Sequence, residues 1–274
     1  MSISRVKNIA IAVLILINAF FLAIIIIDTY ADARDERQTL ENVCEVLRAN
    51  GIAISPDSIT PAGTLRTMRT ARGEEFEASI ANALLGEVDL TDRGLIYLYE
   101  NEEKGSAEFS SAGNFEISLN VGVITNTEGS LRKAQELLKE MKLETTGATV
   151  YAESKTEIVT VYGAYRDARI FNCVIYFTFE EGSLRTVTGR FVTGIEPTQN
   201  SAELSYVSTA LLEFLAAVKR GDAECDEIQS VEAGYIHSVA GPFGEGQIEP
   251  VWLITTPTAQ YTINSTTGET RVVN

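Results

Sequence analysis

The chain opens with a run of uncharged, mostly apolar side chains that differs from everything after it. Residues 8–27 (NIAIAVLILINAFFLAIIII) carry no charge, and their only two polar side chains are asparagines. At about 1.5 Å per residue, a helix of this length would be roughly 30 Å long, the thickness of a bilayer's hydrocarbon core. Arg5 and Lys7 precede it, and basic residues stay preferentially in the cytoplasm. The pattern predicts a cytoplasmic tail (residues 1–7), a transmembrane anchor and an extracytoplasmic bulk.

A cleaved signal peptide is the alternative interpretation of this run. The apolar core of a signal peptide is about 7 to 15 residues long and ends in small residues at the cleavage point. Here the run is longer and ends in four isoleucines, and the small residues Ala31 and Ala33 come only after an aspartate and a tyrosine. The sequence therefore favours retention of residues 8–27 as an anchor.

After the anchor, helical and strand-like patterns alternate along the chain. Apolar residues recur with helical spacing in four segments, at residues 35–50, 74–85, 130–141 and 204–218. Each is followed by runs rich in Val, Ile, Tyr, Phe and Thr that predict strands: residues 64–72, 95–99, 107–110, 115–119, 149–152, 157–165, 170–179, 184–193, 228–240, 250–255, 260–264 and 271–273.

One arrangement, a helix followed by an antiparallel meander, recurs in this order. We therefore predict an α+β fold with a membrane-proximal unit (28–126), a middle unit (127–197) and a C-terminal unit (198–274). Each helix is expected to cover one face of its own meander, so that each unit has a small core. The units share no residue-level identity, so the repeat is one of architecture.

The charge of the chain excludes one class of partner. The formal net charge is −16, and all 38 Asp and Glu residues follow residue 27. Such a surface repels a phosphate backbone, so we expect no nucleic-acid binding.

Groups capable of catalysis are sparse. Cys44, Cys173 and Cys225 lack the spacing of metal ligands, and the sequence leaves open whether two of them pair. Cys173 lies in an apolar run and is predicted to be a small core residue. The only histidine, His237, is predicted to be a partly buried strand residue. The acidic segment 222–227 lacks the glycine and the terminal glutamate of a calcium loop. We expect no enzymatic activity, no cofactor and no metal site.

Two sets of residues are candidates for interactions. In the anchor, Asn18 lies near the bilayer centre, where an amide without a partner is costly, and Ala12, Ala19 and Ala23 line one helix face. Polar and small residues of this kind mediate contacts between transmembrane helices. The sequence does not identify the partner helix, since the anchor of a second copy or that of a different protein could form these contacts.

The second set lies in the C-terminal unit. Trp252 and Tyr261 occupy neighbouring strand segments and would point to a sheet face. Packing within the sheet or core is the favoured interpretation, and a docking surface is the alternative.

Short motifs at both ends of the chain resemble a known family. They are SRVKNI (4–9), INAFFL (17–22), LRANGI (47–52), EAGY (232–235), PVW (250–252), YTIN (261–264) and TGE (267–269). Together they are similar to the YycI type of regulatory protein of Gram-positive bacteria, related to YycH, and the C-terminal unit resembles PepSY-type domains.

The resemblance implies a membrane-anchored extracytoplasmic regulator without catalytic residues. Members of this family act on the sensor histidine kinase of a cell-wall-regulating two-component system, together with a YycH-like partner. The expected function is therefore that of an adaptor. The alternative is a PepSY-like envelope binding or protease-inhibitory module that the anchor merely tethers.

Overall fold

The computed structural model describes residues 36–199, 201–239 and 246–273. No helix in these three segments is long and apolar enough to cross a bilayer. The predicted anchor lies outside the described residues, together with its candidate contact residues Ala12, Asn18, Ala19 and Ala23.

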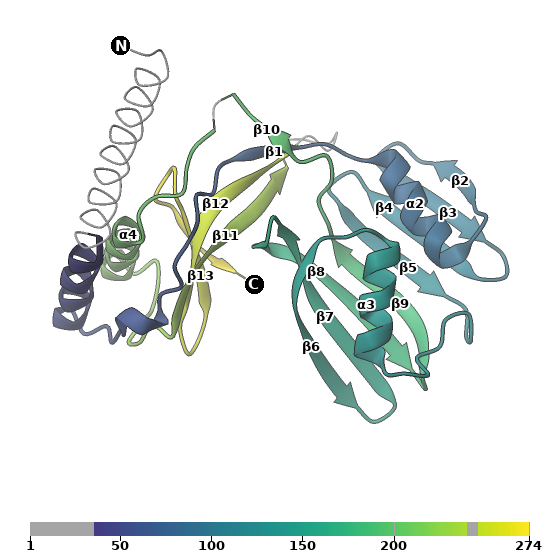
Figure 1. The fold of residues 1–274 in the computed structure, drawn as a ribbon, viewed down its shortest axis with the longest axis horizontal. Coiled ribbons are helices and arrows are strands. Elements are labelled where there is room, and N and C mark those ends of the chain that lie inside the picture. Colours follow the sequence, from purple (N-terminus) through teal and green to yellow (C-terminus); the bar gives the residue numbers. More distant parts are fainter. Residues whose placement is uncertain (1–35, 200, 240–245, 274) are drawn as a thin grey trace, which may run out of the picture.

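The described residues form a strand-rich α+β fold, as the sequence predicts (Figure 1). The helices are residues 36–49, α2 (Glu74–Leu85), α3 (Ser130–Glu140) and α4 (Val207–Arg220), with a short 3-10 turn, η1 (Pro56–Ser58). The strands are β1 (Met68–Thr70), β2 (Asp89–Asp92), β3 (Ile96–Asn101), β4 (Gly105–Ser110), β5 (Asn114–Leu119), β6 (Thr145–Glu153), β7 (Thr156–Tyr165), β8 (Ala168–Glu180), β9 (Ser183–Arg190), β10 (Glu196–Pro197), β11 (Ser230–Val239), β12 (Gly246–Thr255), β13 (Gln260–Asn264) and β14 (Thr270–Val273).

The first half of the fold is a sheet that α2 and α3 cover on the same face (Figure 1). Strands β2 to β5 form one meander and β6 to β9 form a second, and antiparallel pairing of β5 with β9 joins them. Both helices bury their apolar stripes in one continuous core, to which α2 contributes Ile80 and Leu84, α3 contributes Leu137, and the strands contribute Phe109 and Phe177.

The second half consists of β1 and β10 to β14, covered by residues 36–49 and α4. Its core joins Leu47 of the first described helix, Phe214 of α4, and Val231 and Ile254 of the sheet. The helix at residues 36–49 thus packs against a sheet that follows it by nearly two hundred residues.

The expectation that each predicted unit has its own core is therefore wrong. One core spans the boundary predicted at residue 127, and the other joins the start of the membrane-proximal unit to the C-terminal unit. The physical reason is that an apolar stripe must be buried but does not specify against which sheet. The boundaries at 127 and 198 stay predictions.

Strand β8 joins the two halves. Its first part pairs in parallel with β11, where Ile170 lies opposite Tyr235, and its last part pairs with β9. The Asn172 side chain brackets the backbone of His237, accepting a hydrogen bond from its N–H at 2.9 Å and donating one to its carbonyl at 2.8 Å. This junction fixes the sheets relative to one another.

Candidate functional site

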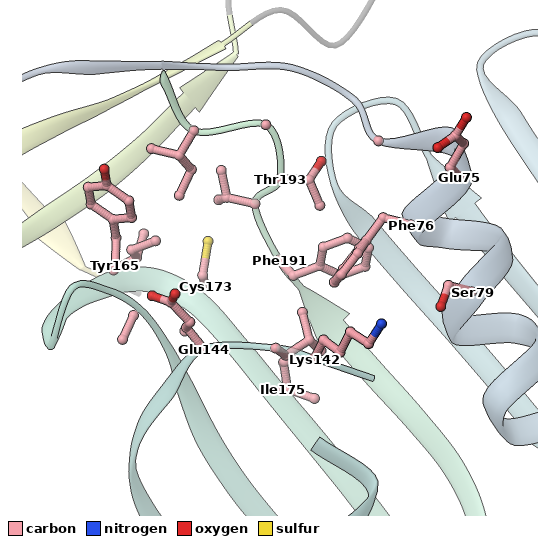
Figure 2. Close-up of a pocket in the computed structure, with 18 residues that line it drawn as sticks. Glu75, Phe76, Ser79, Lys142, Glu144, Tyr165, Cys173, Ile175, Phe191 and Thr193 are labelled. Atoms are coloured by element: carbon pink, nitrogen blue, oxygen red, sulfur yellow. The ribbon is translucent and has the colours of Figure 1, made fainter. Parts of the chain in front are cut away.

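A cleft of about 620 Å³ opens beside this junction (Figure 2). Four segments that are distant in sequence form its walls: the start of α2, the connection from α3 to β6, the end of β7 with the first part of β8, and residues 191–195. Its volume is in the range typical of ligand-binding clefts.

The floor of the cleft is apolar. Ile170, Cys173 and Ile175 of β8 are almost completely buried there. The rings of Phe76 and Phe191 meet edge to face, with centroids 5.8 Å apart, and close one side of the floor. A floor of this kind favours an apolar side chain over a charged one.

The rim of the cleft is polar and carries both signs of charge. Glu75 and Ser79 project from α2, while Lys142 and Glu144 come from the connection between α3 and β6 (Figure 2). On the remaining side, the Thr193 hydroxyl donates a hydrogen bond of 2.8 Å to the carbonyl of Ala71. An apolar floor with a polar rim is the arrangement found where one protein binds a side chain of another.

The one thiol in the cleft, that of Cys173, is a poor nucleophile. Burial raises the pKa of Cys173 to about 12, against a smaller opposite effect of Arg190. The thiol therefore stays protonated at neutral pH, and the thiolate is the form that reacts as a nucleophile. Cys44, Cys173 and Cys225 are all free, and within the described segments no group of His, Cys, Asp and Glu side chains could hold a metal ion.

Trp252 and Tyr261 lie in the second core rather than at the cleft. Both are about 95% buried. The Trp252 indole donates to the carbonyl of Ser205 at 2.9 Å, and the Tyr261 hydroxyl bonds the backbone of Glu224 at 3.2 Å. Their rings and polar ends are thus satisfied inside the protein, in agreement with the packing interpretation.

Sequence reasoning did not find the cleft. Of its lining residues, the sequence singled out only Cys173, as a small core residue. The rim residues come from three separate segments, and nothing in their local spacing indicates that they meet. In the structure Lys142 adopts a left-handed backbone (φ 54°), which is uncommon outside glycine and marks a specific turn at the rim, but the sequence carries no signal for it.

Comparison with known proteins adds little to this picture. No family model and no curated protein matches the sequence. Among solved structures, an uncharacterized protein from Eubacterium rectale ATCC 33656 is similar with a TM-score of 0.49 and 12% identity over 80% of this chain and 88% of that chain. The Bacillus megaterium YpeB C-terminal domain is similar with a TM-score of 0.36 and 12% identity over 75% and 99%. At these scores, neither similarity carries an argument about function.

Proposed function

We propose that the chain is a membrane-anchored extracytoplasmic adaptor that regulates the sensor histidine kinase of a cell-wall-related two-component system. The uncharged run at residues 8–27 supports the anchor, and the motifs at both ends support the kinase and a YycH-like protein as partners. The PepSY-like character of the C-terminal unit is part of the same proposal.

The cleft is the observation that carries the adaptor function. Its apolar floor and polar rim suit an apolar side chain presented by a protein, and the protonated Cys173 thiol does not supply a nucleophile. A receptor site of this kind on the outer region would let the adaptor bind a partner outside the membrane in addition to contacts within it.

Site-specific photocrosslinking tests the cleft in the intact membrane protein. A photoreactive residue at Ser79, on the rim, should form an adduct with an epitope-tagged sensor kinase or YycH-like protein in whole cells. Ala83 is the matched control, because it is exposed on the same helix but does not line the cleft. Equal adducts from both positions, or none from Ser79, would contradict a role for the cleft.

The anchor is tested separately. Exchanging residues 8–27 for an unrelated apolar helix, at equal protein level, should alter the output of a reporter driven by the two-component system, because Asn18 and the alanine face are lost. The same photocrosslinker at position 18 should capture the kinase. Full regulation by the released fragment 34–274 would instead favour a binding module that the membrane only tethers.

A further inference from the structure

A second cavity, of about 790 Å³, lies between the two halves of the fold. Its walls are residues 60–68, the first part of β6, the turn from β7 to β8, and the start of β11. Three arginines line it: Arg66, Arg166 and Arg169. Two carboxylates, Asp167 and Glu232, line it as well, so basic side chains outnumber acidic ones in this cavity, whereas the whole protein has a net charge of −16.

Two of these guanidinium groups are held by aromatic rings and not by carboxylates. Arg169 lies over the Tyr162 ring at 3.5 Å, and its Nε atom is buried without a hydrogen-bond partner in the described part of the chain. Arg166 lies 5.3 Å from the centre of the Tyr165 ring. Stacking on aromatic rings orients a guanidinium group while leaving its edge free to donate hydrogen bonds.

Within the described residues, neither Arg166 nor Arg169 forms an ion pair, although Asp167 and Glu232 line the same cavity. Ion pairs are formed by Arg66, Arg69, Arg72, Arg132, Arg185, Arg220 and Arg271. The third arginine, Arg66, pairs with Glu203, and both side chains are more than half exposed. The cavity therefore presents two guanidinium groups that lie against aromatic rings and form no ion pair among the described residues, and such groups favour a carboxylate or another flat anion.

The free edge of β6 beside the cavity indicates that the anion belongs to an extended polypeptide. Among the described strands β6 pairs only with β7, so its other edge is free. Residues 146–149 of β6 line the arginine cavity, and the strand is exposed from Gly147 to its end. A free strand edge presents unpaired backbone N–H and C=O groups, which another extended polypeptide can pair with.

The other edge strands of the described sheet, β2, β10 and β14, are protected against pairing with another chain, whereas β6 is not. Edge strand β2 carries two aspartates, β10 is a two-residue Glu-Pro segment, and β14 carries Arg271. Short length, charge and proline all discourage pairing at an edge. From Thr145 to Ala152, β6 has neither charge nor proline. The bulge at Gly147 interrupts its regular ladder only near the start, which leaves Ala148–Ala152 available.

We propose that this cavity binds an extended acidic peptide segment of a partner protein. The segment pairs with the free edge of β6 as an added strand, and an acidic side chain of the segment binds between Arg166 and Arg169. The proposal goes beyond the adaptor function and does not depend on the identity of the kinase, because it concerns a different cavity. Failure of peptide binding would leave the crosslinking experiment at Ser79 unaffected.

Fluorescence polarisation with the full chain in nanodiscs tests the proposal. The probe is a fluorescein-labelled synthetic peptide of alternating Glu and Val residues, with the length of β6. Two matched peptides serve as controls. One carries Gln in place of every Glu, which removes the negative charge. The other carries Pro in place of alternate Val residues, which removes backbone N–H groups needed for hydrogen bonds to β6. At roughly 0.15 M salt, where long-range repulsion is screened, the Glu–Val peptide should bind at least about tenfold more tightly than either matched peptide.

Variants of the protein locate the site. The double variant Arg166→Gln/Arg169→Gln should weaken binding of the Glu–Val peptide by about tenfold or more, because both charge-assisted contacts are lost. Arg93→Gln is the control, since Arg93 is exposed, lies outside the cavity and forms no ion pair within the described residues. Unchanged thermal unfolding of the variants establishes that they are folded.

Three outcomes would overturn the proposal. Equal affinity for the Glu and Gln peptides would remove the role of charge, and equal binding by the double variant and by Arg93→Gln would remove the site. Full displacement by inorganic polyphosphate, combined with equal binding of the Pro peptide, would indicate a site for anionic polymers and not for a strand.

Discussion

At the residue scale, a buried ion pair fastens α2 to the first sheet. Nε and Nη2 of Arg72 each lie 2.9 Å from a carboxylate oxygen of Glu77, and the two side chains are only 12% and 4% exposed. Arg72 also donates to the carbonyl of Phe109 and lies 4.0 Å from the centre of the Tyr97 ring. Burial raises the pKa of the Glu77 carboxyl, although Arg72 opposes the shift. Each charge is therefore tolerated only because of the other.

Glu77→Gln should destabilise the fold by about 3 kcal/mol, because it leaves the Arg72 charge buried and uncompensated. Urea unfolding of the full chain in detergent measures the change. Glu128→Gln is the matched control, since Glu128 pairs with Arg132 on the surface and such pairs contribute less than about 1 kcal/mol. Similar losses in both variants would mean that burial does not set the strength of the Arg72–Glu77 pair.

His237 makes the junction sensitive to acid. Its side chain is 6% exposed, its Nε2 atom lies 3.2 Å from the Thr70 hydroxyl, and its Nδ1 atom has no partner among the described residues. Burial, assisted by the positive charge of Arg190, lowers the pKa of His237 from 6.5 to about 4. The folded protein therefore keeps this ring neutral, while the unfolded chain takes up a proton near pH 6.5.

The sign of the pH effect follows from this difference. Keeping His237 neutral adds no penalty to the free energy of unfolding above pH 6.5. As the pH falls from 6.5 toward 4, the unfolded chain takes up a proton that the folded protein does not, and the free energy of unfolding decreases by up to about 3 kcal/mol. In His237→Gln, which stays neutral, the loss of unfolding free energy between pH 7 and pH 4 should be smaller by that amount. Identical pH profiles for the two proteins would show that His237 is not the titrating group.

At the element scale, the helix at residues 36–49 depends on a sheet far along the chain. Leu47 is completely buried beside α4, whereas Val46, one position earlier, is 43% exposed. The chain's only tryptophan, Trp252, lies in the same core, so its fluorescence reports on this half of the fold.

Leu47→Ala should therefore lower the midpoint of the tryptophan-detected unfolding transition, at a cost of about 3 kcal/mol for the cavity. Val46→Ala should change stability by less than about 0.5 kcal/mol, since it alters a surface position of the same helix. A large effect of Val46→Ala, or none of Leu47→Ala, would place the helix elsewhere than on this core.

At the scale of the whole molecule, close backbone contact joins the two sheets. A Cβ atom on Gly234 of β11 would lie 2.5 Å from the carbonyl oxygen of Arg169 and 2.6 Å from the Phe171 ring. Only glycine allows β8 and β11 to approach this closely.

Gly234→Ala should force β8 and β11 apart, at a cost of roughly 2 kcal/mol. The two halves should then unfold separately, so that the transition detected by Trp252 fluorescence no longer coincides with the one detected by circular dichroism. Gly63→Ala is the control, because a Cβ atom there would meet nothing within 4 Å. Coincident transitions in Gly234→Ala would show that the β8–β11 contact does not couple the halves.

Local patterns predicted much of this fold because helices and strands follow from periodicities of a few residues. The helix predicted over residues 74–85 coincides with α2, and the runs at 157–165 and 170–179 coincide closely with β7 and β8. Two strands were missed, β2 and β10. Strand β2 reads Asp-Leu-Thr-Asp and β10 is a two-residue Glu-Pro segment, and both are exposed throughout, so neither has a buried face to leave a pattern. The buried position of Cys173 also followed from its apolar run, whereas His237, predicted to be partly buried, is 6% exposed.

The sequence by itself thus determined the α+β class, most of the elements and the prediction of an anchor, because these depend on neighbouring residues. Only the tertiary structure decided that β5 pairs with β9, that residues 36–49 cover the C-terminal sheet, and that Arg166 and Arg169 share a cavity with the edge of β6. An apolar stripe indicates that one face of a helix is buried, whereas the sheet that covers this face is set by contacts between residues far apart in the chain. Both candidate sites lie where such distant segments meet.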